Sequence, residues 1–448
     1  MEFTPWTVFT DLGLVLALLL FGKLLRAKVR LVQRLFIPAS ILAGLLGLLL
    51  GPNGVGFLPF SENIGTYPSV LIALIFAAIP LGQTINLRQL ARRAGTLWSY
   101  TQAMRILQWG LGLLVGLLVL KSIFNVPDGF GLLLAAGFVG GHGTVAAVGT
   151  AFEGLGWEEA TSLGFTSATV GVVAAILGGL ALIKWGTRTQ RTTVLTDFAD
   201  LPEELRTGLI PRQRREPTGQ GTISSNSLEP LAFHLGLIFL SALVAYYLSE
   251  LAERVNPQIS VPVFGVAFLV GLIVQGLLVL TGGVSYVDRG TVTGVTGTAT
   301  DLLVAFSIAS IVPSVVADNA LPLTILLVFG LFYCLLLFRY LAPIMFSEYA
   351  FEKGIFDWGW STGTVAMGIA LLRIVDPNLE SETLEEYGIA YIPIAPVDVL
   401  VTTFAPFLVA FGFAWAFVGA SLALGAGVLI LAWFLGWWAI SPKRPQSS

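Results

Sequence analysis

Long apolar runs recur from one end of the sequence to the other, and this feature restricts the possible folds most strongly. Examples are residues 12–20, 41–50, 111–120 and 422–438. Only 11% of the residues are charged, whereas a soluble globular domain has about 25%. A soluble fold could not bury so much apolar surface, and a spanning helix needs about 20 apolar residues. The sequence therefore predicts an all-α polytopic protein of the lipid bilayer.

Eleven apolar segments have about the length of a transmembrane helix. We expect helices at 6–25, 35–52, 68–85, 97–120, 162–184, 230–250, 261–282, 294–316, 322–346, 388–413 and 416–440. Two further stretches, 130–152 and 355–375, are apolar but interrupted by glycine, serine and threonine. Non-helical backbone at membrane depth is tolerated only where protein surrounds it, so both stretches are interpreted as re-entrant segments.

The basic residues predict how the chain is oriented. An outer N-terminus, with both re-entrant segments returning to their starting side, places the strongly basic loops in the cytoplasm. A multi-pass protein of the inner (plasma) membrane results, with a cytoplasmic central linker and C-terminus. The basic residues concerned are Arg26, Lys28, Arg30, Arg34, Arg88, Arg92, Arg93, Arg188, Arg191, Arg206, Arg212, Arg214, Arg215, Lys443 and Arg444.

Two sequence echoes indicate an internal repeat. The motif Gly-Thr-Val-Ala occurs at 143–146 and again at 363–366, and residues 71–79 resemble residues 303–311. Each repeat would contain five helices with a re-entrant segment before the fifth, and an odd number of crossings inverts the second repeat. We expect a first repeat at 1–185, a linker at 186–229, an inverted repeat at 230–414, and an additional C-terminal helix with a basic tail at 415–448.

Inverted repeats with interrupted helices are typical of secondary transporters, whose binding sites lie near the bilayer midplane. The first candidate site is Gly140-Gly141-His142-Gly143-Thr144, because glycines allow a close backbone approach and helix-start N–H groups bind carboxylates. The second repeat offers the hydroxyls and glycine of Ser361, Thr362, Gly363 and Thr364. Arg373, which closes this stretch, is a candidate partner for a substrate carboxylate.

Ionisable residues inside the membrane are functional candidates, because each costs at least about 2.5–3.5 kcal/mol at the bilayer centre. Asp398 lies between Pro396 and Thr402 in what reads as a broken helix, where carboxylate and hydroxyl could share a cation. Asp301 is a second cation candidate, or else a helix cap. Asp11 is expected to be structural, and Arg105 to snorkel towards the cytoplasmic interface.

The stretch from Gly140 to Thr144, continuing through Thr169 to Gly171, resembles the first re-entrant region of the bacterial sodium/glutamate symporters. Gln108 and Asp398 also fall where that family has Gln and Asp. The resemblance implies a homodimer with a five-plus-five core, re-entrant loops that meet near its middle, and Na⁺-coupled uptake of glutamate by an elevator-like movement. Candidate Na⁺ ligands are then Thr169, Asp398, Thr402 and Asp301.

The second re-entrant loop departs from that family, since Trp358, Trp360, Ser361 and Thr362 replace a glycine-rich pattern with a His and a Thr-Pro step. Three alternatives therefore remain. The substrate could be another small organic anion such as a dicarboxylate, the coupling ion could be the proton, or the protein could be a passive channel or a sensor on the same fold. The sequence has no Walker loop, Cys/His cluster or nucleophile triad, so we expect neither an enzyme nor a nucleic-acid partner.

Overall fold

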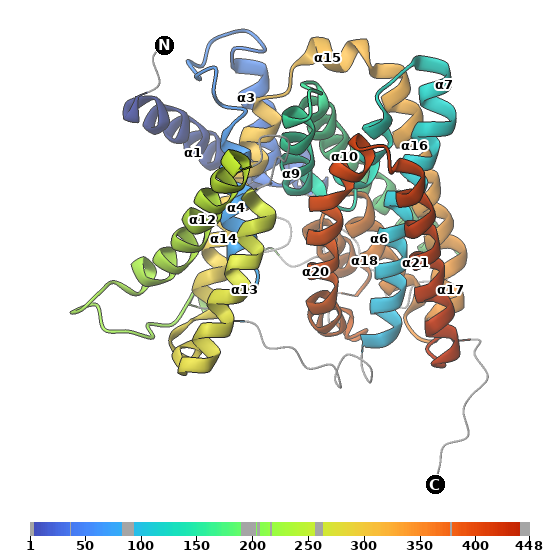
Figure 1. The fold of residues 1–448 in the computed structure, drawn as a ribbon. Helices are drawn as coiled ribbons and strands as arrows, with labels where there is room; N and C mark the ends of the chain where they lie inside the picture. The colour runs from blue at the N-terminus through green and yellow to red at the C-terminus, as the bar shows by residue number, and fades with distance from the viewer. Residues whose placement is uncertain are drawn as a thin grey trace.

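The computed structural model describes residues 4–35, 37–82, 94–189, 203, 207–215, 217–255, 263–376 and 379–439. Within these residues all regular secondary structure is helical (Figure 1). Nine of the described helices are long and apolar enough to cross a membrane, and α3 and α4 are shorter apolar helices. The predicted polytopic all-α class is confirmed.

The first half of the chain contains five long or apolar helices and one pair of shorter helices. α1 begins where the Thr4 side chain caps the first turn, with Pro5 at the first helical position, which suits the fixed φ of proline. The helices are α1 (Pro5–Lys28), α2 (Arg30–Arg34), α3 (Ala39–Leu50), α4 (Tyr67–Ala78), α6 (Gly95–Val115, continued by η2 and α7 to Phe124), η3 (Asp128–Gly131), α8 (Leu132–Gly137), α9 (Gly141–Gly154) and α10 (Ala160–Arg188).

The second half also contains a pair of shorter helices before a long helix, and one further long helix follows. Its first long helices follow the linker, in which η5 (Arg212–Arg214) is a single short turn. The helices are α12 (Pro230–Val255), α13 (Val263–Thr281), η6 (Gly283–Tyr286), α14 (Arg289–Ala309), α15 (Pro313–Asp318), α16 (Ala320–Leu336, continued by η7 and α17 to Met345), α18 (Ala350–Thr362), α19 (Val365–Val375), α20 (Thr383–Ala410) and α21 (Ala414–Phe434).

Each of the two interrupted stretches is a pair of helices with a break between them. In the first pair, α8 ends at Gly137 and α9 begins at Gly141. In the second pair, α18 ends at Thr362 and α19 begins at Val365. The arms of the second pair touch where Gly359 faces Gly368, because a Cβ on Gly359 would lie 2.6 Å from the Gly368 nitrogen. Only glycine fits such an approach.

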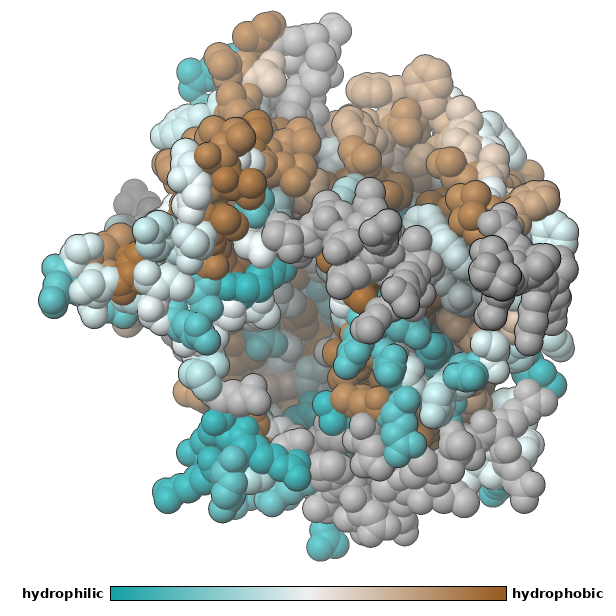
Figure 2. All heavy atoms as spheres, turned by 90° about the horizontal axis from the view of Figure 1, so that it is seen from below, coloured by the Kyte–Doolittle hydropathy of each residue, from teal (hydrophilic) through white to brown (hydrophobic). Residues whose placement is uncertain are grey.

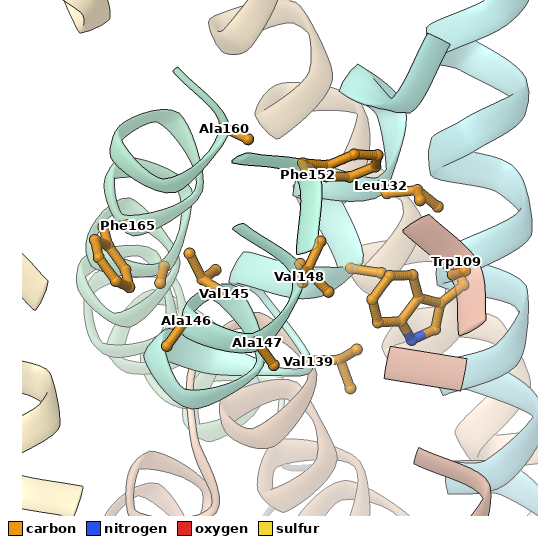
Figure 3. Packing of buried hydrophobic residues seen from close by; sticks show 14 of the residues in the cluster. Trp109, Leu132, Val139, Val145, Ala146, Ala147, Val148, Phe152, Ala160 and Phe165 are labelled. Carbon is orange, nitrogen blue, oxygen red and sulfur yellow. The ribbon is translucent and has the colours of Figure 1, made fainter. Parts of the chain in front are cut away.

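Apolar side chains hold the first pair among its neighbours. Figure 3 shows Trp109 of α6 pointing towards Val139 and Val148, with Phe165 of α10 on the other side of α9. These side chains belong to one buried cluster that also includes Ile72 of α4. The backbone of the break is thereby enclosed in protein, where non-helical backbone can persist at membrane depth.

The described helices form two groups that lie side by side in Figure 1. The α4 group contains α1, α3, α4, α12, α13 and α14. The α6 group contains α6, α8, α9, α10, α16, α18, α19, α20 and α21. From the lower side, Figure 2 shows hydrophilic side chains around a hollow between the groups. The two groups therefore do not correspond to the two halves of the sequence, because each group contains helices from both halves.

Two predictions about helix limits were wrong. The helix predicted at 294–316 begins earlier, at Arg289, because Asp288 caps it: the Thr291 hydroxyl and backbone N–H donate to the Asp288 carboxylate at 2.7 Å and hold its pKa below the usual value. That helix ends at Ala309 and a separate helix starts at Pro313. In contrast, α20 runs unbroken through Pro393, Pro396 and Pro406, so Asp398 does not lie in a broken helix.

Several basic residues used to predict orientation fall outside the described residues. They are Arg88, Arg92, Arg93, Arg191, Arg206, Lys443 and Arg444. The linker predicted at 186–229 is described only in part, and in that part the Lys23 side chain of α1 donates to the Gly208 carbonyl.

Candidate functional site

A cavity of about 470 Å³ lies where the two helix pairs face the α4 group. Its lining comes from both breaks, from α6 and α20 on one side, and from α3, α4 and α14 on the other. A Cβ placed on Gly141 would lie 3.6 Å from the Gly363 carbonyl oxygen, so the two breaks are in contact distance of each other. Segments that are more than two hundred residues apart in the sequence thus line the same cavity.

The first break contributes all five residues of its glycine-rich motif, from Gly140 to Thr144. Gly141 has a φ of +68°, in the left-handed region that favours glycine, and this allows α9 to start directly at the cavity. The Thr144 hydroxyl donates to the Gly140 carbonyl at 3.0 Å and closes the turn. The predicted first loop therefore does lie at the cavity.

His142 is buried and is held by α10. Its Nε2 lies 3.1 Å from the Thr169 hydroxyl, which already donates its only hydrogen to the Phe165 carbonyl at 2.8 Å. Nε2 is therefore the donor, and Nδ1 is an acceptor without a partner among the described residues. Thr169 does not line the cavity, and its hydroxyl contacts His142, which does.

The second break contributes Gly363 and Thr364. Because α19 begins at Val365, a second helix N-terminus faces the cavity beside that of α9. The first N–H groups of a helix have no partner within it, and with the helix dipole they attract anions.

Gln108 of α6 connects the two breaks. Its Nε2 donates to the Ser361 carbonyl at 3.2 Å, and its Oε1 accepts from the Val139 backbone N–H at 3.3 Å. The Sγ atom of Cys334 lies 3.4 Å from the same Nε2. One buried amide thus satisfies polar backbone groups on both helix pairs and fixes the distance between them.

Arg105, which is buried, and Asp398, which is partly buried, form an ion pair at the wall of the cavity. The Arg105 Nε donates to Asp398 Oδ1 at 2.9 Å, and Nη2 donates to Oδ2. The guanidinium carbon lies 5.0 Å from the centre of the Trp360 ring. Arg105 is only 6% exposed, so the expectation that it snorkels to the interface was wrong. Its Nη1 has no hydrogen-bond partner among the described residues.

The α4 group contributes a second acidic residue from across the cavity. Asp301 and Thr300 of α14 line it, and the Ser40 side chain of α3 lies beside Asp301. Thr402, one turn after Asp398, also lines the cavity. Carboxylate and hydroxyl oxygens are hard ligands that suit Na⁺. Asp301 is the more available carboxylate, because Arg105 holds both oxygens of Asp398.

Four of the predicted site residues lie away from the cavity lining: Thr169, Ser361, Thr362 and Arg373. Ser361 and Thr362 are buried in the last turn of α18, where the Thr362 hydroxyl donates to the Trp358 carbonyl at 2.6 Å. Arg373 lies near the far end of α19. Asp11 is buried as a structural group, since it accepts hydrogen bonds from the Ser61 backbone N–H, the Ser61 hydroxyl and the Tyr67 hydroxyl.

A known protein family matches most of the chain. The family model described as sodium/glutamate symporter matches residues 7–349 of the 448-residue chain. The chain belongs to the sodium/glutamate symporter family. It is therefore a membrane transporter of the symporter type, for which the family indicates sodium and amino-acid transport. No curated protein and no solved structure gives a significant match.

The match to the symporter family ends immediately before α18. The first glycine-rich break and Gln108 lie inside the matched region, whereas the second break and Asp398 lie after it. This limit falls where the sequence also departs from the family's pattern of residues. The part of the cavity formed by Trp360, Tyr391 and Asp398 is thus the part that the family comparison does not cover.

Sequence reasoning missed Trp360 and Tyr391 as lining residues, Arg105 as the partner of Asp398, and Asp357 of α18 as a buried acid. The sequence did contain a signal for two of these four residues, Arg105 and Asp357. Arg105 and Asp357 are ionisable residues within apolar segments, and such residues are functional candidates wherever they occur. Trp360 gave no signal, because tryptophan in a membrane protein is common at the interface.

Proposed function

We propose that this symporter carries glutamate, or a similar small anionic amino acid, into the cell together with Na⁺. The observation that carries the proposal is the meeting of two helix N-termini and the Arg105–Asp398 pair in one cavity. Helix N-termini and a guanidinium attract carboxylates, and a carboxylate attracts an ammonium group. An amino acid with an acidic side chain presents both kinds of group.

Arg105 and Asp398 would then exchange partners when the substrate binds. In the structure the two charges satisfy one another, which avoids leaving either one without a partner. A substrate carboxylate replaces Asp398 at the guanidinium, and the substrate ammonium replaces Arg105 at the carboxylate. The unpartnered Nη1 of Arg105 provides a first point of attachment before that exchange.

Sodium is the second cargo, and the oxygen donors around the cavity suit it. Asp301 with Ser40 and Thr300 on one side, and Thr402 on the other, are its candidate ligands. Moving a monoanion inward against a negative-inside potential costs about 2.3 kcal/mol per 100 mV, so a single Na⁺ makes the step electroneutral. A second Na⁺ makes the membrane potential assist uptake.

We propose alternating access by an elevator-like displacement of the α6 group against the α4 group. The cavity lies at the boundary between these groups, and the repeated order of elements supports two repeats of opposite orientation, each with a re-entrant pair. The N-terminus would lie outside, with the linker and the C-terminus in the cytoplasm. The protein would act as a homodimer in the plasma membrane, as the family resemblance implies.

The test is uptake of radiolabelled glutamate into proteoliposomes. Three conditions are compared: an inward Na⁺ gradient, equal Na⁺ on both sides, and K⁺ alone. We expect accumulation above the outside concentration only with the gradient. Uptake that never exceeds equilibration contradicts coupled transport and favours a channel. Accumulation of a dicarboxylate but not of glutamate would contradict the proposed substrate and keep the mechanism.

A further inference from the structure

Asp357 is a fully buried acid that the cavity does not reach. It lies in α18 with 0% of its surface exposed and is absent from the cavity lining. The Thr101 hydroxyl donates to its Oδ1 at 2.9 Å. Its Oδ2 has no hydrogen-bond partner, and no basic group lies within ion-pair distance of it, among the described residues.

Asp357 lies about one helical turn away from the Arg105–Asp398 ion pair, on the side that faces away from the cavity. Thr101, which touches it, is four residues before Arg105 on α6 and therefore faces the same side of that helix. Trp360, which lies under the guanidinium, is three residues after Asp357 on α18. Arg105 thus acts electrostatically on both carboxyl groups, but it forms its ion pair with Asp398 alone among the described residues.

Burial without an ion-pair partner disfavours the charged form of the Asp357 carboxyl group and shifts its equilibrium towards the protonated form. With both acids ionised, Asp357, Arg105 and Asp398 together carry one net negative charge. An anionic substrate in the cavity adds a second negative charge and occupies the guanidinium. Binding of the substrate therefore favours a proton on Asp357, and loss of the substrate favours its release.

The other ionisable groups around α18 do not supply a missing cation. α6 also brings Tyr100, α16 brings Tyr333 and Cys334, and all three are buried and uncharged around neutral pH. α20 brings Asp398, Tyr387 and Tyr391, together with Glu386, which pairs with Lys353 of α18. Arg339 of η7 lies over Trp185, Lys184 of α10 is exposed, and Arg373 of α19 makes no ion pair with Asp357.

We propose that Asp357 is a proton-binding site linked to the cavity, so that one proton travels with each anionic substrate molecule. The proton comes from water on the entry side, an O–H bond forms at the Asp357 carboxylate as the substrate binds, and that bond breaks on the exit side as the substrate leaves. The inference rests on the proposed transport of an anionic amino acid and adds a second coupling ion to it.

The test measures proton movement and substrate exchange separately in the same proteoliposomes. Na⁺ is equal on both sides, a pH-sensitive dye is enclosed, and glutamate is added outside. We expect the lumen of wild-type vesicles to acidify in step with uptake. Asp357→Asn should keep glutamate counterflow and lose the acidification. Asp11→Asn, which removes a buried and fully hydrogen-bonded carboxylate of α1, should acidify like the wild type.

Two outcomes overturn the inference alone: net glutamate uptake by the wild type without acidification, and acidification in Asp357→Asn equal to that of the wild type. Absence of wild-type counterflow overturns the proposed transport of glutamate and, with it, the inference.

A second measurement does not depend on the folding of a variant. Glutamate binding to wild-type protein in detergent is followed by calorimetry in two buffers of different ionisation enthalpy, at neutral pH and at higher pH. We expect proton uptake that rises towards one proton per glutamate as the pH rises, because the substrate-free protein then holds less of the proton and the coupling of the two ligands is reciprocal. Binding without proton uptake contradicts the site.

Discussion

Arg105 and Asp398 show why the role of a charged residue inside the membrane can be judged only together with that of its ion-pair partner. The Arg105 side chain is 7% exposed and that of Asp398 20%, so neither is held in open water. Removing one member of a buried pair leaves the other uncompensated, which is far more destabilising than removing both. This asymmetry distinguishes a transport role from a purely structural role.

We predict that Asp398→Asn abolishes coupled uptake and lowers the free energy of unfolding by about 3–5 kcal/mol. The double variant Arg105→Gln with Asp398→Asn should recover most of that stability and remain inactive. Thermal unfolding in detergent and uptake in proteoliposomes measure the two effects. A double variant no more stable than either single variant would contradict the pairing, and wild-type uptake in Asp398→Asn would remove this residue from the site.

Thr144 and Thr150 form a matched pair on α9. Both hydroxyls donate to the carbonyl four residues earlier, at 3.0 Å and 2.7 Å, but only Thr144 lines the cavity. We predict that Thr144→Val abolishes coupled uptake, because a hydrogen bond to a charged ligand contributes about 1.5–3 kcal/mol. Thr150→Val should transport normally. Equal uptake by the two variants would show that Thr144 acts only within its helix.

The candidate site could be predicted from the sequence where its signal is local. The motif from Gly140 to Thr144 carries its own backbone chemistry, and all five residues lie at the cavity. Arg105 could not be assigned, because its partner is 293 residues away and depends on how α6 meets α20. Ser361 and Thr362 were expected at the site by type, yet the turn of α18 directs them into the protein.

At the scale of elements, α10 supports both breaks at once. Gly171 lies between them, since a Cβ there would overlap the Thr362 carbonyl oxygen and lie 3.0 Å from a ring carbon of Phe138. The position of most helices followed from hydropathy alone, including both interrupted stretches. The continuity of α20 did not, because the prolines that suggested a break are accommodated within the helix.

We predict that Gly171→Ala lowers the free energy of unfolding by about 1–3 kcal/mol, as overpacking does in a tightly packed core. It should also reduce uptake, because both breaks must shift. Gly419→Ala on α21 is the control: nothing lies within 4 Å of a Cβ there, and alanine is favoured over glycine in a helix. Melting curves that coincide for the two variants would contradict the close packing at Gly171.

For the whole molecule, the boundary between the α4 and α6 groups is the feature that the proposed elevator-like displacement changes. Gly265 of α13 and Thr403 of α20 meet at this boundary, where a Cβ on residue 265 would lie 3.4 Å from the Thr403 Cβ. Disulfides have Cβ atoms about 3.5–4.5 Å apart. The division into groups was not predictable from hydropathy, because it depends on which helices pack together and not on which helices exist.

We predict that oxidised Gly265→Cys with Thr403→Cys loses at least about nine-tenths of its uptake, because the disulfide joins the two groups. Reduction should restore uptake. The pair Ala342→Cys with Gly354→Cys is the control, since its Cβ atoms lie 3.3 Å apart within the α6 group. Full uptake by the oxidised boundary pair would contradict any displacement of one group against the other.

The last helix, α21, limits how far a transporter of this kind can be shortened. α21 packs along α6, where a Cβ on Gly110 would lie 2.8 Å from the Ser421 Cβ and one on Gly425 would lie 2.5 Å from Leu107. These contacts flank Gln108, the residue that joins the two breaks. A chain truncated after residue 413 would lack α21 and would expose the surface of α6 around Gly110 to lipid. A minimal engineered version of the transporter therefore has to keep this last helix.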